Sequence, residues 1–183
     1  ANLDNQLMGA DFTYRESQLF GGDKSIAINS HFMNSDDGEQ GSGNSYGFLA
    51  QAPNKPLSLW AGWMQIEEQF DPALGFVRRR NTEFIYGEGF YEIQPRNRTV
   101  IDNYDLGLEW TRFNRLSDGA IESDIATAVA EVDLRSGEEI GVRGRTSREV
   151  LFEPFDIIDT VTIDKGDYRF EQVGAYFESS SNW

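Results

Sequence analysis

The residues best suited to chemistry lie between positions 67 and 80. Glu67, Glu68 and Asp71 are followed by three consecutive arginines at positions 78–80. Two carboxylates that flank a bound sugar can act as the acid and the base of glycoside hydrolysis. The same side chains can instead form ion pairs that hold a connector between two strands, because the two signs of charge lie close together. We expect the second arrangement, and therefore no catalytic residue in this segment.

The single histidine and the tryptophans are weaker candidates. His31 has no serine or cysteine at a spacing that forms a nucleophile and its base, so we expect a lumen or surface residue. Trp60 and Trp63 are three residues apart in a predicted strand and point to opposite faces, which excludes a shared stacking platform for a sugar. The acidic loop at residues 35–44 lacks the ligand spacing of a calcium-binding EF-hand. We expect no cofactor and no metal site.

Charge and composition exclude several classes of protein. The 183 residues include 31 acidic and 16 basic side chains, a net charge of −15, which does not suit binding to the phosphates of nucleic acid. The absence of cysteine excludes a disulfide framework and thiol catalysis. The first residues do not resemble a signal peptide, and no apolar run is long enough for a spanning helix. We expect either a processed chain or one that begins within a longer protein.

Aromatic and β-branched runs, separated by clusters of Gly, Asn, Asp and Pro, organise the chain that carries these residues. They predict an all-β fold, an antiparallel up-and-down meander of about nine long strands in a single domain, residues 1–183. The predicted strands cover residues 6–14, 24–33, 45–52, 57–66, 83–93, 103–111 and 124–135, a strand that begins near residue 139, and a final unit at 159–179. Such a meander is typical of a transmembrane β-barrel or part of a larger one, and an odd strand number favours the part.

The turn at residues 136–138 predicts a hairpin between the seventh and eighth strands. Gly137 can adopt the positive φ that a short hairpin loop needs. The seventh strand is rich in alanine, which favours helices, yet its apolar residues alternate with a period of two. We predict one face that contains Val132, Leu134, Ile140 and Val142.

Alternation along the sixth strand predicts two faces of opposite character. The residues predicted to face lipid are Tyr104, Leu106, Leu108 and Trp110, and those predicted to face a polar lumen are Asp105, Glu109, Glu131, Asp133, Arg143 and Arg145. Predicted strands of about nine to eleven residues, with aromatic side chains near many strand ends, favour a membrane-spanning sheet. A soluble sandwich or closed barrel with an apolar interior remains the alternative.

The connector at residues 70–80 is too apolar to be a free loop tip. We predict an ordered structural connector in which the phenyl rings pack on the barrel wall or in its mouth and the arginines pair with Glu67, Glu68 or lumen carboxylates. The residues assigned to it are Phe70, Leu74, Gly75, Phe76, Arg78 and Arg79.

Two motifs resemble a family of bacterial outer-membrane barrels classed as domain of unknown function 5916. Residues 69–79, QFDPALGFVRR, resemble its "F…LGFV.R" segment, and residues 151–156, LFEPFD, with 166–170, GDYRF, resemble its "L.EPF…G.Y.F" pattern. The two matches span residues 60–177. The chain departs from the family at residues 80–81, Arg-Asn, where the family often has an acid.

The resemblance implies the outer membrane of a Gram-negative-type bacterium as the location and outer-membrane lipid as the partner. In full-length members the barrel follows a module similar to family-9 carbohydrate-binding domains, which is absent from these residues. The function it implies is a pore, receptor or anchor with a polar lumen and no catalysis by this segment. The alternatives are a soluble all-β module that binds carbohydrate or protein, and the barrel part of a membrane-associated carbohydrate-processing hydrolase.

Overall fold

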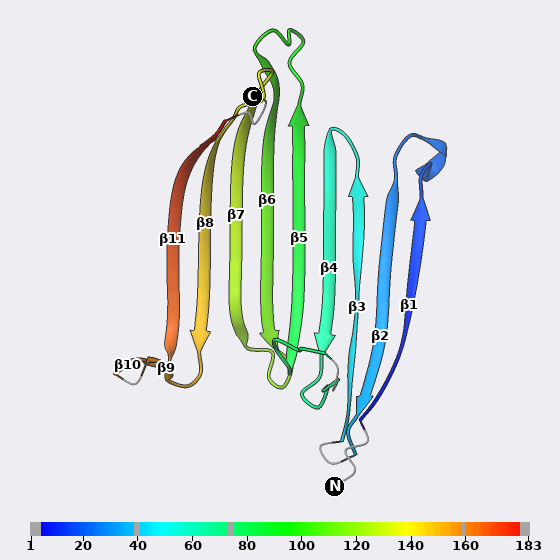
Figure 1. The fold of residues 1–183 in the computed structure, drawn as a ribbon, viewed down its shortest axis with the longest axis vertical. Helices are drawn as coiled ribbons and strands as arrows, with labels where there is room; N and C mark the ends of the chain where they lie inside the picture. The colour runs from blue at the N-terminus through cyan, green and yellow to red at the C-terminus, as the bar shows by residue number, and fades with distance from the viewer. Residues whose placement is uncertain (1–4, 39–40, 73–74, 159, 180–183) are drawn as a thin grey trace. The chain divides into compact units, whose positions relative to one another are not determined.

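The structure, a computed structural model, describes residues 5–38, 41–72, 75–158 and 160–179, and nine of its strands form one sheet (Figure 1). These strands are β1 (Gln6–Glu16), β2 (Ile26–Asp36), β3 (Ser42–Pro53), β4 (Leu57–Ile66), β5 (Thr82–Ile93), β6 (Ile101–Arg115), β7 (Ile121–Leu134), β8 (Glu139–Leu151) and β11 (Gly166–Glu178). Neighbours in the sheet follow the order of the chain, and the order contains no pairing of β1 with β11 within the described residues. The prediction of an all-β antiparallel meander is confirmed.

Three short elements complete the chain. A 3₁₀ helix, η1 (Leu19–Gly21), lies between β1 and β2, while β9 (Phe155–Ile158) and β10 (Val161–Ile163) pair with each other in a separate two-stranded sheet. This small hairpin was not predicted from the sequence. The predicted final unit begins at Asp159, which lies outside the described residues. No helix in the part of the chain that the structure describes is long and apolar enough to cross a membrane.

The predicted loop at residues 35–44 is wrong at both ends. Ser35 pairs with Gly43 and Asp36 pairs with Ser42, so the ladder between β2 and β3 continues into the polar segment. Backbone groups hold this ladder, and they form the same hydrogen bonds whichever side chains they carry. Residues 39–40 lie outside the described part of the chain.

The hairpin between β7 and β8 is confirmed in the predicted register. Val132 pairs with Ile140, and the N–H of Leu134 donates to the carbonyl of Glu138 at 2.8 Å. Gly137 has a φ of 96°, in the left-handed region that favours glycine. The alanine-rich segment is therefore a strand.

The chain divides into two compact units, each of which contains part of the sheet. Unit 1 comprises Ala1–Ala52, Trp60–Tyr86 and Arg112–Ile121, and unit 2 comprises Pro53–Leu59, Gly87–Thr111 and Glu122–Trp183. Strands β4, β5 and β6 contribute residues to both units.

The structure contains very little conventional core. Among the described residues, Phe70 is the one large apolar side chain that is buried, with 3% of its surface exposed. Large apolar residues that alternate along the strands, such as Met8, Phe12, Leu106 and Leu108, are exposed instead. The alternation therefore produces an apolar sheet face that no part of the described chain covers.

Candidate functional site

The segment between β4 and β5 lies against β3 in unit 1. A Cβ atom on Gly43 would come within 2.2 Å of the backbone nitrogen of Phe70, so this close approach requires glycine in β3. The neighbouring Asn44 donates from its backbone N–H to Oε2 of Glu67 at 2.9 Å, and from its side-chain Nδ2 to the same oxygen at 3.0 Å. These contacts fix the start of the connector on the sheet.

Asp71 holds the middle of the connector. Its backbone N–H donates to Oγ of the buried Ser35 at 2.7 Å, and its carbonyl accepts from Nδ2 of Asn5 at 2.8 Å. The Asp71 carboxylate pairs with the guanidinium of Arg80 at 2.6 Å. Among the described contacts, Arg80 thus pairs with Asp71, while Glu67, one of the predicted arginine partners, accepts hydrogen bonds from Asn44.

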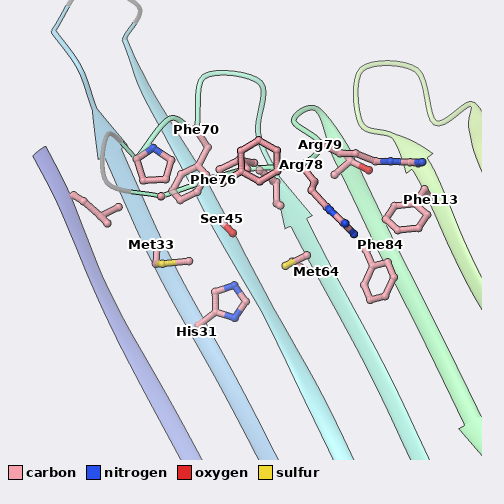
Figure 2. Close-up of a pocket in the computed structure, with 16 residues that line it drawn as sticks. His31, Met33, Ser45, Met64, Phe70, Phe76, Arg78, Arg79, Phe84 and Phe113 are labelled. Carbon is pink, nitrogen blue, oxygen red and sulfur yellow. The ribbon is translucent and has the colours of Figure 1, made fainter. Parts of the chain in front are cut away.

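A cavity of about 860 Å³ lies between the connector and the sheet in unit 1 (Figure 2). We call it the connector cavity. Its walls are mostly apolar, and they include Leu7, Met33, Met64, Ile66, Phe70, Phe84 and Phe113. Alternate residues of the strands point to this face, and the connector covers it at one end. The arrangement leaves an apolar space that is open on one side.

Arginines of the connector line the same cavity. Arg79 lies over the Phe113 ring, with its Cζ 4.3 Å from the ring centroid, and Phe113 packs against Phe84 with 5.0 Å between centroids. Arg78 also lines the cavity, and within the described chain it has no ion pair or hydrogen bond. Guanidinium groups thus lie beside an apolar wall.

The connector residues predicted from the sequence have different environments. Phe70 is buried, whereas Phe76 is 89% exposed at the open side of the cavity, so the expectation that both rings pack was wrong for Phe76. The N–H of the preceding Gly75 donates to the carbonyl of Pro72 at 3.0 Å. Leu74 lies outside the described residues.

His31 lies in the cavity wall, on the strand face opposite that of Phe32. Its Nε2 is shielded from solvent and has no hydrogen-bond partner in the described residues. No hydrogen bond joins His31 to a serine among the residues that the structure describes.

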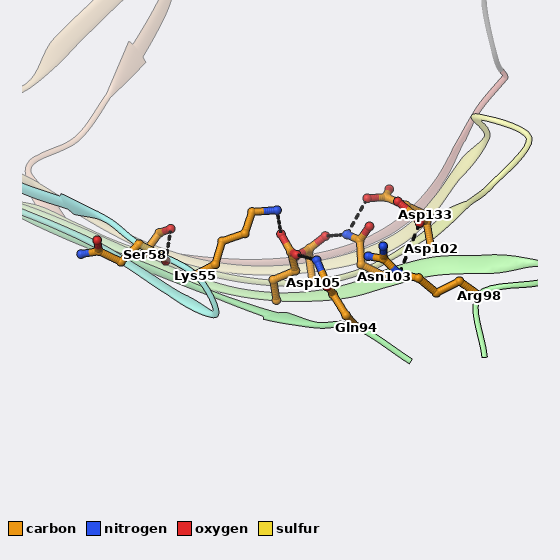
Figure 3. Close-up of polar contacts among 10 residues, drawn as sticks. Lys55, Ser58, Gln94, Arg98, Asp102, Asn103, Asp105 and Asp133 are labelled. Atoms are coloured by element: carbon orange, nitrogen blue, oxygen red, sulfur yellow. Dashed lines mark hydrogen bonds and ion pairs between the residues drawn. The ribbon is translucent and has the colours of Figure 1, made fainter. Parts of the chain in front are cut away.

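In unit 2, polar side chains form a network on one face of the sheet (Figure 3). Asn103 donates to Asp105 and, at 2.7 Å, to Asp133. Lys55 pairs with Glu92 at 2.6 Å. Two of the predicted lumen residues, Asp105 and Asp133, are thus joined by an amide that the sequence analysis did not select.

A second polar group on this face of unit 2 involves β7, β8 and β11. The Tyr176 hydroxyl donates to the carboxylate of Glu131, and the guanidinium of Arg143 lies over the Tyr176 ring at 5.6 Å from its centroid. Tyr176 pairs with Gly141, which leaves room for the phenol ring. Glu109, Arg143 and Arg145 line one shallow pocket with Glu131. The predicted polar residues therefore share a face, and the alternation of β11 was the signal that could have identified Tyr176.

The predicted lipid-facing residues lie on the other face of unit 2. Tyr104, Leu106 and Leu108 are exposed, while Trp110 is partly covered and donates from Nε1 to Asp124 at 2.7 Å. In the neighbouring strands Val132 pairs with Ile140, and Ile140 pairs with Phe177. The apolar face thus continues across β6, β7, β8 and β11. On this face the indole N–H of Trp110 is bonded to the polar side chain of Asp124.

The turn between β6 and β7 carries the clearest electrostatic effect outside the strands. Nε of Arg115 donates to the Asp118 carboxylate at 3.0 Å, and the N–H of Ala120 donates to it at 3.0 Å. The bond from the Arg115 side chain, more than any other contact, lowers the pKa of Asp118 to about 2.

No group of three or more potential metal ligands occurs among the residues that the structure describes. Comparison of the chain with known protein families, curated proteins and solved structures found no match.

Proposed function

We propose that this chain forms the wall of a bacterial outer-membrane β-barrel, or part of a larger one, that acts as a pore, receptor or anchor. In this proposal the apolar face contacts lipid, the polar face lines an aqueous lumen, and this segment carries out no catalysis. The observation that carries the proposal is the exposure of large apolar side chains on one face of the strands, together with a single buried large apolar residue in the described chain.

The accessible surface is larger than expected for a folded soluble monomer of this mass. The accessible surface is 12,850 Å², whereas a folded soluble monomer of 20.7 kDa is expected to expose about 8,900 Å². The difference of about 3,900 Å² is larger than most protein–protein interfaces bury on one partner. Lipid can cover a surface of this extent without a specific partner.

The strands are long enough for the proposed role. The nine strands of the large sheet range from 10 residues in β4 to 15 in β6, and a tilted strand needs about 9–11 residues to cross a bilayer. Strands in soluble proteins are usually about 5–6 residues long. The additional residues would extend beyond the hydrocarbon.

The polar networks of unit 2 suit an aqueous lumen. Carboxylates such as Asp105 and Glu131 have amide, hydroxyl or guanidinium groups beside them, and they lie on the face opposite Leu106 and Leu108. The resemblance to the domain of unknown function 5916 barrels supports the same location in the outer membrane. It adds a carbohydrate-binding module as a possible fused partner.

Site-directed fluorescence in lipid tests this proposal against a soluble module. Cysteines at Leu106 and Leu108, and matched cysteines at Asp105 and Glu109, can be labelled singly because the chain has no native cysteine. We expect a lipid-restricted quencher to reach labels at 106 and 108 only, and a water-soluble quencher to reach 105 and 109. Equal quenching at all four positions would refute the lipid-facing assignment and favour the soluble module.

A further inference from the structure

The connector cavity joins two features that rarely occur together in a structural core. Its walls are apolar, with the flexible side chains of Met33 and Met64 among them, and Arg78 and Arg79 line it from the connector. Figure 2 shows both arginine side chains extending from the connector towards the aromatic rings of Phe84 and Phe113. An apolar space beside cationic groups is suited to an amphiphile with an anionic head.

The local charge differs from that of the whole chain. The chain carries a net charge of −15, yet residues 78–80 are three consecutive arginines. Arg80 pairs with Asp71, and the contacts of Arg79 include the face of Phe113, whereas Arg78 has no anionic partner among the described residues. The Arg78 guanidinium thus lies beside an apolar cavity without an anionic partner among the described residues.

We propose that the connector cavity binds a long-chain fatty acid. The carboxylate lies at Arg78 and Arg79, since guanidinium groups bind carboxylates through paired hydrogen bonds. The acyl chain lies along Met33 and Met64, whose thioether side chains adapt to a flexible ligand. The volume of about 860 Å³ falls within the range of about 300–1,000 Å³ that is usual for small-molecule sites.

The site lies entirely in unit 1, and binding of a fatty acid there does not require contact between the sheet and lipid. The binding proposal and the membrane proposal can therefore fail separately. Each methylene that enters the cavity should tighten binding by about fourfold until the chain fills it. Affinity should consequently rise from octanoate to palmitate, and methyl palmitate should bind more weakly because it lacks the charge.

Equilibrium dialysis of radiolabelled palmitate against the delipidated protein in an amphipathic polymer tests the proposal. We expect saturable binding at one site per chain. The double variant Arg78→Gln/Arg79→Gln should weaken it by about 3- to 10-fold, because both guanidiniums are partly exposed to solvent. Arg96→Gln, which removes an exposed arginine elsewhere, should leave it unchanged.

A second pair of variants tests the position of the acyl chain. Met33→Trp fills the cavity and should reduce palmitate binding more than octanoate binding, whereas Met8→Trp changes a side chain that is 71% exposed and absent from the cavity wall. Circular dichroism checks that each variant retains its strands. If Met33→Trp does not fold, the chain-length series and the arginine variants decide the question.

Three results would overturn the proposal. The first is non-saturable uptake that matches uptake by the polymer alone, and the second is equal affinity for palmitate and its methyl ester. The third is unchanged binding in a folded Arg78→Gln/Arg79→Gln variant. Saturable, charge-dependent and length-dependent binding would support it even if the fluorescence experiment places the sheet outside lipid.

Discussion

Replacement of Leu108 with arginine measures what covers the apolar face. Leu108 is the eighth of 15 residues in β6 and 68% of its surface is exposed. At about 3.3 Å per residue the strand is about 50 Å long, or about 38 Å along the membrane normal at a tilt of about 40°. The midpoint of β6 would therefore lie near the middle of a hydrocarbon band about 25 Å thick.

The loss of stability expected for Leu108→Arg depends on whether hydrocarbon or water surrounds this side chain. If this face contacts hydrocarbon, Leu108→Arg should lower the free energy of unfolding by about 2–4 kcal/mol. If the face contacts water, the substitution replaces one exposed side chain with another and should change stability by less than about 0.5 kcal/mol. Val100→Arg is a matched control, because Val100 is 65% exposed but lies just outside β6.

The free energies of unfolding of both variants can be measured by urea titration of the protein folded into phosphatidylcholine liposomes. Tryptophan fluorescence follows the unfolding. We expect Val100→Arg to cost at most about 1 kcal/mol, as arginine does near a bilayer interface. Glu109→Gln, on the opposite face, should have little effect. The reasoning would be refuted by equal, small effects of Leu108→Arg and Val100→Arg.

Two further predictions follow from the connector and from the turn between β6 and β7. Gly43→Ala should shift the connector and destabilise it by about 1–3 kcal/mol, because its Cβ would meet the backbone of Phe70. Limited trypsin digestion should then cleave residues 78–80 faster than in the wild type and in the control Gly87→Ala, whose Cβ meets no atom within 4 Å; unchanged cleavage would contradict this. The lowered pKa of Asp118 means that the turn is stabilised at pH values above the unfolded pKa of about 3.9. This contribution should disappear as the pH falls through about 2, and an NMR titration of the Asp118 carboxyl with a midpoint near 4 would disprove the contact with Arg115.

The strands could be predicted from the sequence because side-chain alternation is a local signal. β4 has the predicted bounds, Leu57–Ile66, and the alanine-rich β7 was identified by its period of two. The start of β3 was missed because Ser42, Gly43 and Asn44 have the composition of a loop. Their strand conformation depends on pairing with β2 and on the connector packed above Gly43, neither of which is a local property.

The candidate site was predictable only in outline. An apolar segment with three arginines indicated an ordered connector, and Phe70 is buried as expected. The partners of Glu67 and Asp71 could not be predicted, since Asn44, Ser35 and Asn5 are distant in the sequence and meet them only in the folded sheet. The cavity itself arises from this long-range packing.

The scarcity of buried apolar side chains also determines what calorimetry would measure. For a soluble domain, the heat-capacity increase on unfolding reflects the apolar core that becomes hydrated. Here Phe70 is the one large apolar side chain buried in the described chain, so the sheet has little core to hydrate. The heat-capacity change of the protein in its natural surroundings would therefore report the apolar area that those surroundings cover.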